Sequence, residues 1–254
     1  MQQKLTEIVR IATLAGEILL KNGAETFRVE DTMERVAKAC GAYRVDTFVT
    51  PTGVFISIRQ ENGKTLTGLK RIKKRRISLD RIAKVNEVSR ALVEGRVDYQ
   101  TALEQLRQIA KAKNTFSWLT AILASGVVGS GTAVIQNGGI GEVLVAFLAA
   151  ALVRSIAHLI VRLNGVPFVF EFLGGATTAL LGVWACKFYP QLYLDAIIVG
   201  GIMPMVPGVA ITNSLRDLMA GFLLTGVARG MEAMVTTAAC PRRDRHLRQR
   251  QNPI

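Results

Sequence analysis

Hydrophobic residues in the first part of the chain recur with two different periods. They lie three and four positions apart in two opening stretches, which predicts two helices separated by a turn at Asn22-Gly23. They then alternate in 43–49 and 54–58, on either side of turn residues at Pro51–Gly53, which predicts two strands. Asn62-Gly63 is a strong signal for a two-residue hairpin that leads into a third strand.

Two more helical patterns close this region. Ser78 and Asp98 are candidate N-caps for them, because a short polar side chain can accept a hydrogen bond from the free amides of a first turn. The predicted order of elements is ααβββαα, with the strands in an antiparallel meander. We therefore expect residues 1–113 to form an α+β domain.

Residues 114–240 have a different character. No charged residue lies between Asn114 and Gly141, a stretch longer than the roughly 20 residues that cross a bilayer. Spans are predicted at about 116–136, 140–161, 168–187 and 194–214. A fifth apolar stretch, 218–240, contains Arg229 and Glu232 and ends abruptly. We expect an all-α polytopic membrane bundle, with four clear spans and a truncated fifth.

The last residues, 241–254, form a basic tail without apolar character. One interpretation is a frameshift or a truncated gene model that cuts the fifth span short. The other is a genuine four-span protein with a basic cytoplasmic tail. Reading the DNA in the other two frames after codon 239 distinguishes them, because a frameshift leaves an apolar run of about 12–15 residues in one of those frames.

Charge is distributed unevenly along the chain. Residues 1–115 hold 22 Lys and Arg against 13 Asp and Glu, from totals of 32 and 19. Because basic residues favour the cytoplasmic side, we expect a multi-pass protein of the plasma (inner) membrane with a cytoplasmic N-terminus. The basic segment Lys70–Arg76 is interpreted as a solvated loop or as a contact with the lipid bilayer at its anionic inner leaflet. No aromatic platform or recognition helix accompanies it, so no nucleic-acid partner is expected.

Signatures of enzymes and metal sites are missing from the sequence. It has no P-loop, HExxH or GxSxG motif. Cys40, Cys186 and Cys240 are too scattered to form a zinc site. We therefore expect no catalytic residues, no cofactor and no metal. Charged residues on the second helix, from Glu30 to Lys38, are interpreted as a solvated face.

The segment from Met203 to Gly208 is the most informative part of the membrane region. Pro204, Pro207 and Gly208 fall within a predicted span, where they free backbone groups that lipid cannot satisfy. Broken helices in mid-membrane are common sites of solute binding, although a simple packing kink explains the pattern as well. Asn213 follows and has the chemistry to bind a solute. Asp217, next to Arg216, is either part of that site or half of a pair at the membrane interface.

Ionisable residues within the spans are further candidates, because charge is costly in hydrocarbon. Arg154 and His158 are four residues apart and share a helix face. A guanidinium suits a substrate carboxylate, and an imidazole can relay protons near neutral pH. Snorkelling of both side chains to the membrane surface is the alternative. Arg229 is a candidate in the fifth stretch. The small residues of the spans are interpreted as helix-packing positions.

Two groups of motifs are informative in combination. The first group is Asn22–Thr26, Arg28–Glu30 and Thr50–Gly53, and the second is Val206–Gly208, Asn213, Asp217 and Thr225–Arg229. The first group resembles the N-terminal domain of the threonine/serine exporter family, and the second resembles the later membrane motif of that family. Within these motifs Gly23, Glu25 and Glu30 match the pattern of the N-terminal domain. The resemblance covers roughly residues 5–238.

The resemblance implies secondary export of a small carboxylate-bearing solute. Members of the family fuse two membrane modules in one chain, whereas this chain is similar to the larger subunit of a split form, a two-component succinate exporter. A second, smaller membrane subunit is then the implied partner, and threonine, serine or succinate the implied substrate. The family pattern also has five spans in this module. The rival hypothesis is a membrane-anchored sensor or scaffold, whose cytoplasmic domain binds a ligand or partner.

Overall fold

The computed structural model describes residues 2–61, 63–73, 76–112, 116–162 and 167–238. The chain divides into two compact units. The first consists of Met1–Lys113 with Gly208–Glu232, and the second of Asn114–Pro207 with Ala233–Ile254. A segment that the sequence assigns to the membrane region, Gly208–Glu232, is therefore grouped with the N-terminal residues. The basic tail 241–254 lies outside the described residues.

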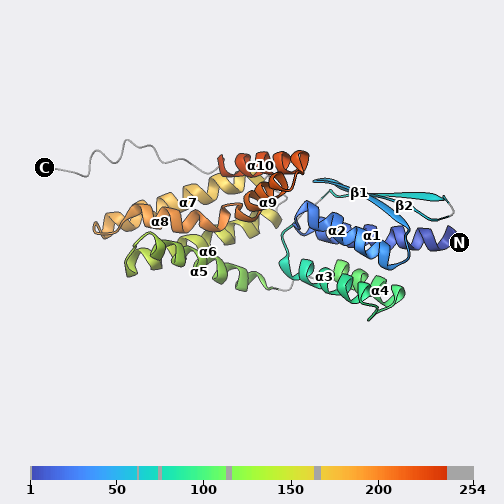
Figure 1. Ribbon diagram of the computed structural model, residues 1–254. Helices are drawn as coiled ribbons and strands as arrows, with labels where there is room; N and C mark the ends of the chain where they lie inside the picture. Colours follow the sequence, from blue (N-terminus) through green and yellow to red (C-terminus); the bar gives the residue numbers. More distant parts are fainter. Residues whose placement is uncertain (1, 62, 74–75, 113–115, 163–166, 239–254) are drawn as a thin grey trace. The chain divides into compact units, whose positions relative to one another are not determined.

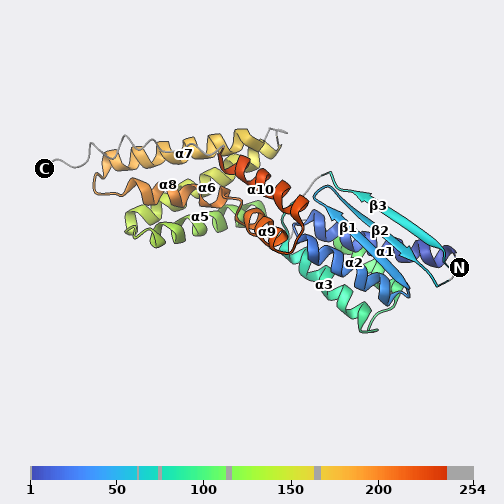
Figure 2. The ribbon, with the colours of Figure 1, turned by 45° about the horizontal axis from the view of Figure 1, so that its top comes forward.

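The N-terminal part of the first unit has three layers, which are a sheet and two pairs of helices. Its elements are α1 (Gln2–Lys21), α2 (Thr26–Ala39), β1 (Arg44–Thr50), β2 (Gly53–Arg59), β3 (Thr65–Arg71), α3 (Leu79–Val93) and α4 (Tyr99–Lys111). The strands form one antiparallel sheet in the order β1-β2-β3, so the predicted meander is confirmed (Figure 2). Helices α1 and α2 pack against the sheet, and α3 and α4 pack against α1 and α2 (Figure 1).

One hydrophobic core runs from the sheet through α1 and α2 to the inner faces of α3 and α4. Inward-facing Val49, Val54 and Ile56 pack with buried residues of α1 and α2. Gly68 of β3 allows α1 to approach the sheet, because a Cβ atom there would lie 2.4 Å from Val9 Cγ1. The outer face is open, and the paired rings of Phe48 and Phe55 lie on it with their centroids 5.9 Å apart.

The ends of the elements agree with the sequence in part. Asp98 caps α4 by accepting a hydrogen bond from the Gln100 amide at 3.1 Å, which confirms the predicted cap. Ser78 occupies the N-cap position of α3, but its side chain makes no capping hydrogen bond. The basic segment 70–76 is not all loop, because β3 runs through Arg71 and Lys70 lies 3.4 Å from Glu17.

Helices α9 (Gly208–Met219) and α10 (Leu223–Ala238) form a hairpin. Its residues Gly208–Glu232 belong to the first unit. The chain turns at Gly221, whose φ of +85° favours glycine. The two helices are close, since Ser214 Oγ donates to the Gly226 carbonyl at 2.7 Å. A Cβ atom on Gly230 would lie 2.8 Å from the same hydroxyl, so the small residue is needed for this packing.

The second unit is a bundle of apolar helices. Its elements are α5 (Trp118–Ile135), α6 (Ile140–Arg162), α7 (Pro167–Phe188), α8 (Leu194–Ile202) and the short 3-10 helix η1 (Met203–Met205). Backbones of α5 and α8 nearly touch, because a Cβ atom on Gly200 would lie 2.7 Å from the Gly129 carbonyl. Buried Glu142 ties the start of α6 to the start of α8 by accepting a hydrogen bond from the Tyr193 amide at 2.8 Å.

The structure supports fewer spans than the sequence predicts. Among the described residues, two helices are long and apolar enough to cross a membrane, Trp118–Ile135 and Ile140–Ile160. A third span results only if Leu194–Met205 and Gly208–Met219 are counted together as one broken span. The apolar helix Phe172–Phe188 is shorter. The prediction of four clear spans is thus not confirmed, while a membrane protein built largely of helices with one small sheet is.

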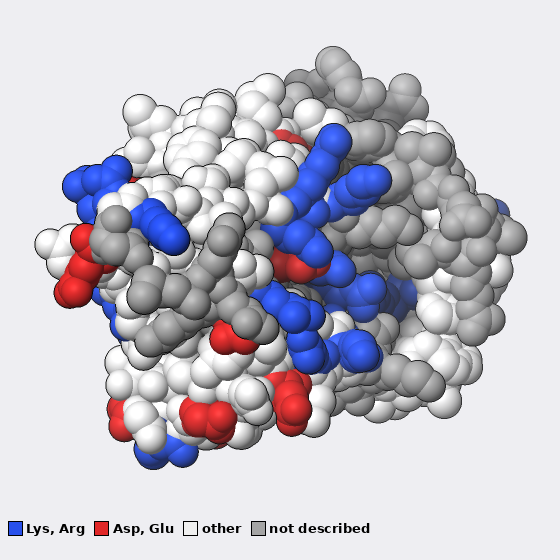
Figure 3. Space-filling model, turned by 90° about the vertical axis from the view of Figure 1, so that its right-hand side faces the viewer, with Lys and Arg blue, Asp and Glu red and all other residues white. Residues whose placement is uncertain are grey.

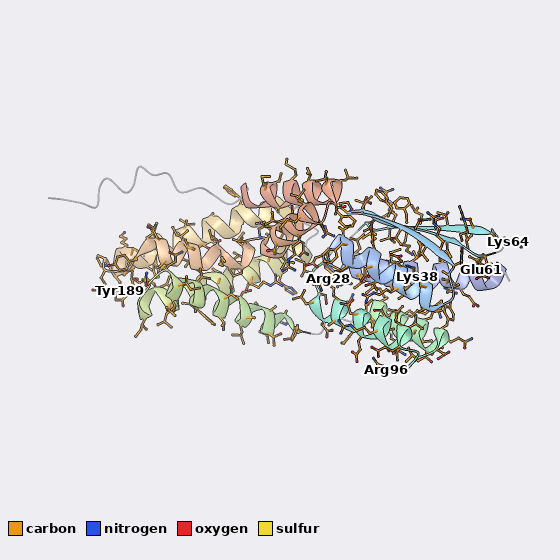
Figure 4. All side chains as sticks on the ribbon, in the orientation of Figure 1. Arg28, Lys38, Glu61, Lys64, Arg96 and Tyr189 are labelled. Carbon is orange, nitrogen blue, oxygen red and sulfur yellow. The ribbon has the colours of Figure 1, made fainter. Side chains whose placement is uncertain are left out.

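Surface charge on the first unit is mixed. The face in Figure 3 carries a stripe of Lys and Arg side chains with acidic groups nearby. On α2, Arg35 pairs with Asp31 and Lys38 with Glu34, both at 2.6 Å. All four side chains are well exposed, so these pairs contribute little to stability. Glu61 and Lys64 lie beside the β2–β3 turn (Figure 4). The predicted solvated face on α2 is confirmed for these four residues.

Candidate functional site

The turn between α1 and α2 presents several backbone groups to the α9–α10 hairpin. Gly23 adopts a φ of +89°, a conformation that glycine allows most easily. Helix α2 then begins at Thr26, and Glu25 before it makes no side-chain capping bond. The first amides of a helix have no partner within the helix, so they need acceptors from elsewhere.

Asp217 of α9 supplies those acceptors. It is completely buried, and its Oδ1 accepts a hydrogen bond from the Thr26 amide at 2.9 Å. Its Oδ2 accepts from Thr26 Oγ1 at 2.9 Å and from Arg229 Nη1 at 3.0 Å. A carboxylate at the start of a helix is also favoured by the helix dipole. Every oxygen of this buried charge is therefore engaged.

Arg229 of α10 completes the buried pair. The residue is 6% exposed, and its Nη2 donates to the Ala24 carbonyl at 3.0 Å. One guanidinium thus links the α9 carboxylate with the α1–α2 turn. A buried ion pair is tolerated when the remaining hydrogen-bonding atoms have partners. Here both carboxylate oxygens of Asp217 and both terminal nitrogens of Arg229 have one.

Four further contacts surround this pair. Glu25 Oε1 pairs with Arg216 of α9, while Glu25 Oε2 lies 2.5 Å from Arg28 Nε without hydrogen-bond geometry (Arg28 is labelled in Figure 4). Asn213 Nδ2 donates to the Gly23 carbonyl at 2.8 Å. Thr225 Oγ1 lies 3.4 Å from the Val49 carbonyl. We call this set the latch, and its residues are Gly23, Ala24, Glu25, Thr26, Asn213, Arg216, Asp217 and Arg229.

The latch brings together candidates that the sequence placed in two separate regions. Gly23 and Glu25 come from the N-terminal motif, and Asn213, Asp217 and Arg229 from the membrane motif about 190 residues later. The possible interface pair of Arg216 with Asp217 is not observed. Instead Arg216 pairs with Glu25, and Asp217 pairs with Arg229.

Glu30, the remaining motif residue, lies apart from the latch. Its Oε1 accepts a hydrogen bond from the Val49 amide at 2.8 Å, which joins α2 to β1. Burial raises the pKa of this carboxyl, and the nearby Glu34 charge adds to the rise, while the Val49 hydrogen bond opposes it. The predicted solvated face of α2 therefore excludes Glu30, which is partly buried and structural.

The other candidates lie in or at the edge of the second unit. Arg154 and His158 of α6 line a pocket with Trp118, whose ring stacks on the His158 ring at a centroid distance of 6.0 Å. Pro204 lies in η1 and Pro207 follows Val206, which is extended at φ −64° and ψ 125°. Helix α9 starts at Gly208, around which a Cβ atom would meet nothing within 4 Å. The helical path is thus interrupted at the predicted place.

Several contributors to these sites were not predicted. Thr26 and the Ala24 carbonyl are central to the latch, and Trp118 forms one wall of the pocket. The position of Thr26 at a helix start was a usable signal, since such amides need acceptors. A backbone carbonyl carries no sequence signal. Among the described residues, no three His, Cys, Asp or Glu side chains are placed to hold a metal ion.

Comparison with known proteins identifies the family. A family model described as "Putative threonine/serine exporter" matches residues 10–240, nearly the whole chain. The chain belongs to the threonine/serine exporter family. This is a family of transporters and not of enzymes. Both groups of latch residues lie within the matched range.

Three relatives show how the chain compares in length. It is 23% identical to the threonine/serine exporter of Corynebacterium glutamicum, and the match covers 91% of this chain but 48% of that protein. For the "Probable threonine/serine exporter" of Mycobacterium tuberculosis the identity is 22%, with 91% and 44% covered. The chain thus spans about half the length of these two relatives.

A third relative has a similar length. The "Probable succinate transporter subunit YjjP" of Escherichia coli is 22% identical, with 92% of this chain and 91% of that protein covered. No solved structure matches the chain. The family is therefore established, while the activity, the substrate and the assembly are matters for proposal.

Proposed function

We propose that this protein is a subunit of a secondary exporter of small amino acids or dicarboxylates, and that it works with a smaller membrane subunit. The observation that carries the proposal is the family match over residues 10–240. A match over 91% of a relative named as a transporter subunit supports the two-component form. The names of the relatives favour threonine, serine or succinate as substrates.

The proposed topology follows the positive-inside rule. Residues 1–113 form a cytoplasmic α+β domain, and residues 114–240 lie in the plasma (inner) membrane as a multi-pass bundle of four spans. The 22 basic residues before position 116 support a cytoplasmic N-terminus. The apolar character of α5 to α8 supports the bundle.

The broken segment is the proposed transport region. Pro204, Pro207 and Gly208 interrupt an apolar helix, and freed backbone groups at such a break can contact a solute. The latch has a different proposed role. Asp217, Arg229 and Asn213 already bind groups of the protein, so a solute would have to displace those partners. We therefore assign them to fastening the N-terminal residues to the hairpin that follows the break.

Efflux from intact cells tests the proposal. Cells that express the chain with a small membrane subunit of the same family are loaded with labelled threonine, serine or succinate, and efflux is measured. We expect efflux of at least one solute that depends on the chain. A Pro204→Ala/Pro207→Ala variant should reduce it severalfold, because it allows a continuous helix.

Pro190→Ala is the matched control, since Pro190 lies in the turn between α7 and α8, away from the break. Its efflux should equal that of the unmodified chain. A sensor or scaffold would show no chain-dependent efflux, and the proline variants would not differ. Equal efflux from the broken-segment variant and the control would refute the role given to the break.

A further inference from the structure

Beyond the broken segment and the latch, the second unit contains a pocket with an unbalanced positive charge. The pocket lies between the start of α5 and the second half of α6 and has a volume of about 310 Å³. This is within the range of about 300–1,000 Å³ that is usual for small-molecule sites. Its described lining consists of Phe116, Ser117, Trp118, Ala121, Ile122, Arg154, Ala157 and His158.

The charged side chain of this lining is a cation, Arg154. Arg154 and His158 are one helical turn apart, so their side chains lie on the same face of α6. No acidic side chain is part of the described lining. A guanidinium is always charged and binds carboxylate or phosphate oxygens through two parallel hydrogen bonds. The chemistry of the lining therefore favours an oxyanion.

His158 provides an independent observation. Its Nε2 is buried and has no hydrogen-bond partner among the described residues. Leaving a buried polar atom without a partner is costly, so such an atom usually has one in the functional state. The Trp118 ring lies parallel to the His158 ring within 15° and covers one side of it. The imidazole is thus held in place beside the pocket.

We propose that this pocket binds the carboxylate group of a small anion, with Arg154 as the charged ligand and His158 Nε2 as a second hydrogen-bonding group. Apolar Ala121, Ile122 and Ala157 leave room for a short carbon chain. The inference rests on the proposed function for the nature of the anion, a small dicarboxylate or amino acid. A lipid headgroup phosphate has the same oxyanion chemistry, and the experiment separates the two.

The intrinsic fluorescence of Trp118 measures binding directly. The chain has two tryptophans, so a Trp184→Phe background leaves Trp118 as the only reporter. The full-length chain, in a neutral detergent and in phosphatidylcholine nanodiscs, is titrated with succinate and with threonine. Phosphatidylglycerol nanodiscs supply the lipid phosphate in a parallel titration. We expect a saturable change in emission with succinate or threonine in the absence of anionic lipid.

Substitutions then test the two ligands. Arg154→Gln should weaken solute binding at least tenfold, and Arg154→Lys, which keeps the charge but not the fork, should weaken it less. His158→Phe should also weaken it. Lys187→Gln is the matched control, since it removes a cation from the last turn of α7 without touching the pocket. Circular dichroism checks that each variant is folded. If Arg154→Gln does not fold, the binding measured with Arg154→Lys tests the role of Arg154.

Three results would overturn the proposal. These are no saturable response to either solute, a response that Arg154 and His158 substitutions leave unchanged, or a response to phosphatidylglycerol alone, which would assign the pocket to lipid. Binding is measured without transport, so the two proposals fail separately. Efflux without binding here refutes only the pocket, whereas binding without efflux refutes only the exporter.

Discussion

Two residues, Asp217 and Arg229, hold the N-terminal turn against the α9–α10 hairpin. Both are buried, and each also binds the backbone of the turn, at the Thr26 amide and the Ala24 carbonyl. Such a pair contributes little compared with a well-packed apolar pair, but removing one member leaves the other charge buried and unpaired. The main effect of the pair on stability should therefore appear when one of its two members is removed.

Replacing Asp217 with Ala should destabilise the protein by about 3–5 kcal/mol, because Arg229 loses its counter-charge while it stays buried. The measurement is the unfolding midpoint of the full-length chain in detergent. Asp31→Ala is the control. It removes one partner of an exposed pair with Arg35, and should cost about 0–1 kcal/mol. A double Asp217→Ala/Arg229→Ala variant should be less destabilised than the sum of the single variants. Additive effects would show that the two side chains do not interact.

Glu30 makes stability depend on pH. Burial raises its pKa in the folded protein above the value of 4.5 of the free group, so the folded state binds its proton more tightly than the unfolded state does. Stability should therefore fall as the pH rises from 4.5 through the raised pKa, and then level off. Glu30→Gln removes this dependence and keeps an oxygen to accept from the Val49 amide.

The unfolding midpoint of the full-length chain between pH 4 and pH 8 gives the test. The difference between Glu30→Gln and the unmodified chain should grow in favour of the variant as the pH rises. A constant difference across this range would mean that Glu30 ionises as a free carboxyl.

At the scale of elements, some contacts follow from local patterns and others do not. The β-meander is visible in the alternation of apolar residues and in Asn62-Gly63, since strand period and turn chemistry are local properties. The joining of the α1–α2 turn to α9 and α10 could not be predicted, because hydrogen bonds between Thr26 and Asp217 cross 191 positions. The motif residues were identified, but the separation into two regions hid their contact.

Close packing of α5 with α6 and α8 depends on Gly129. A Cβ atom there would lie 2.7 Å from Ala150 Cβ and 2.9 Å from the Ala146 carbonyl. Gly129→Ala should therefore lower the unfolding midpoint in detergent or reduce the yield of folded protein. Gly131→Ala, in the same helix, meets nothing within 4 Å and should be tolerated. Equal behaviour of the two variants would contradict the observed packing.

At the scale of the whole molecule, sequence patterns identified an apolar region and an α+β region, but they did not show which segments contact each other. Charge and hydropathy place Gly208–Glu232 with the membrane residues, whereas its contacts group it with the N-terminal unit. Of the candidate residues, those of the latch meet, and Arg154 and His158 share a different pocket. The composition of a segment indicates whether it is apolar or polar, but it does not indicate which other segments it contacts. The grouping of Gly208–Glu232 with the N-terminal unit could therefore not be predicted.

Flux across a sealed membrane shows whether the chain is part of an exporter. The purified chain is reconstituted into liposomes with and without a small membrane subunit of the same family, and uptake of labelled threonine, serine and succinate is followed under an imposed ion gradient. We expect flux of at least one of these solutes, and we expect this flux to require both subunits. No flux of any of the three, under any gradient and with both subunits present, would contradict it.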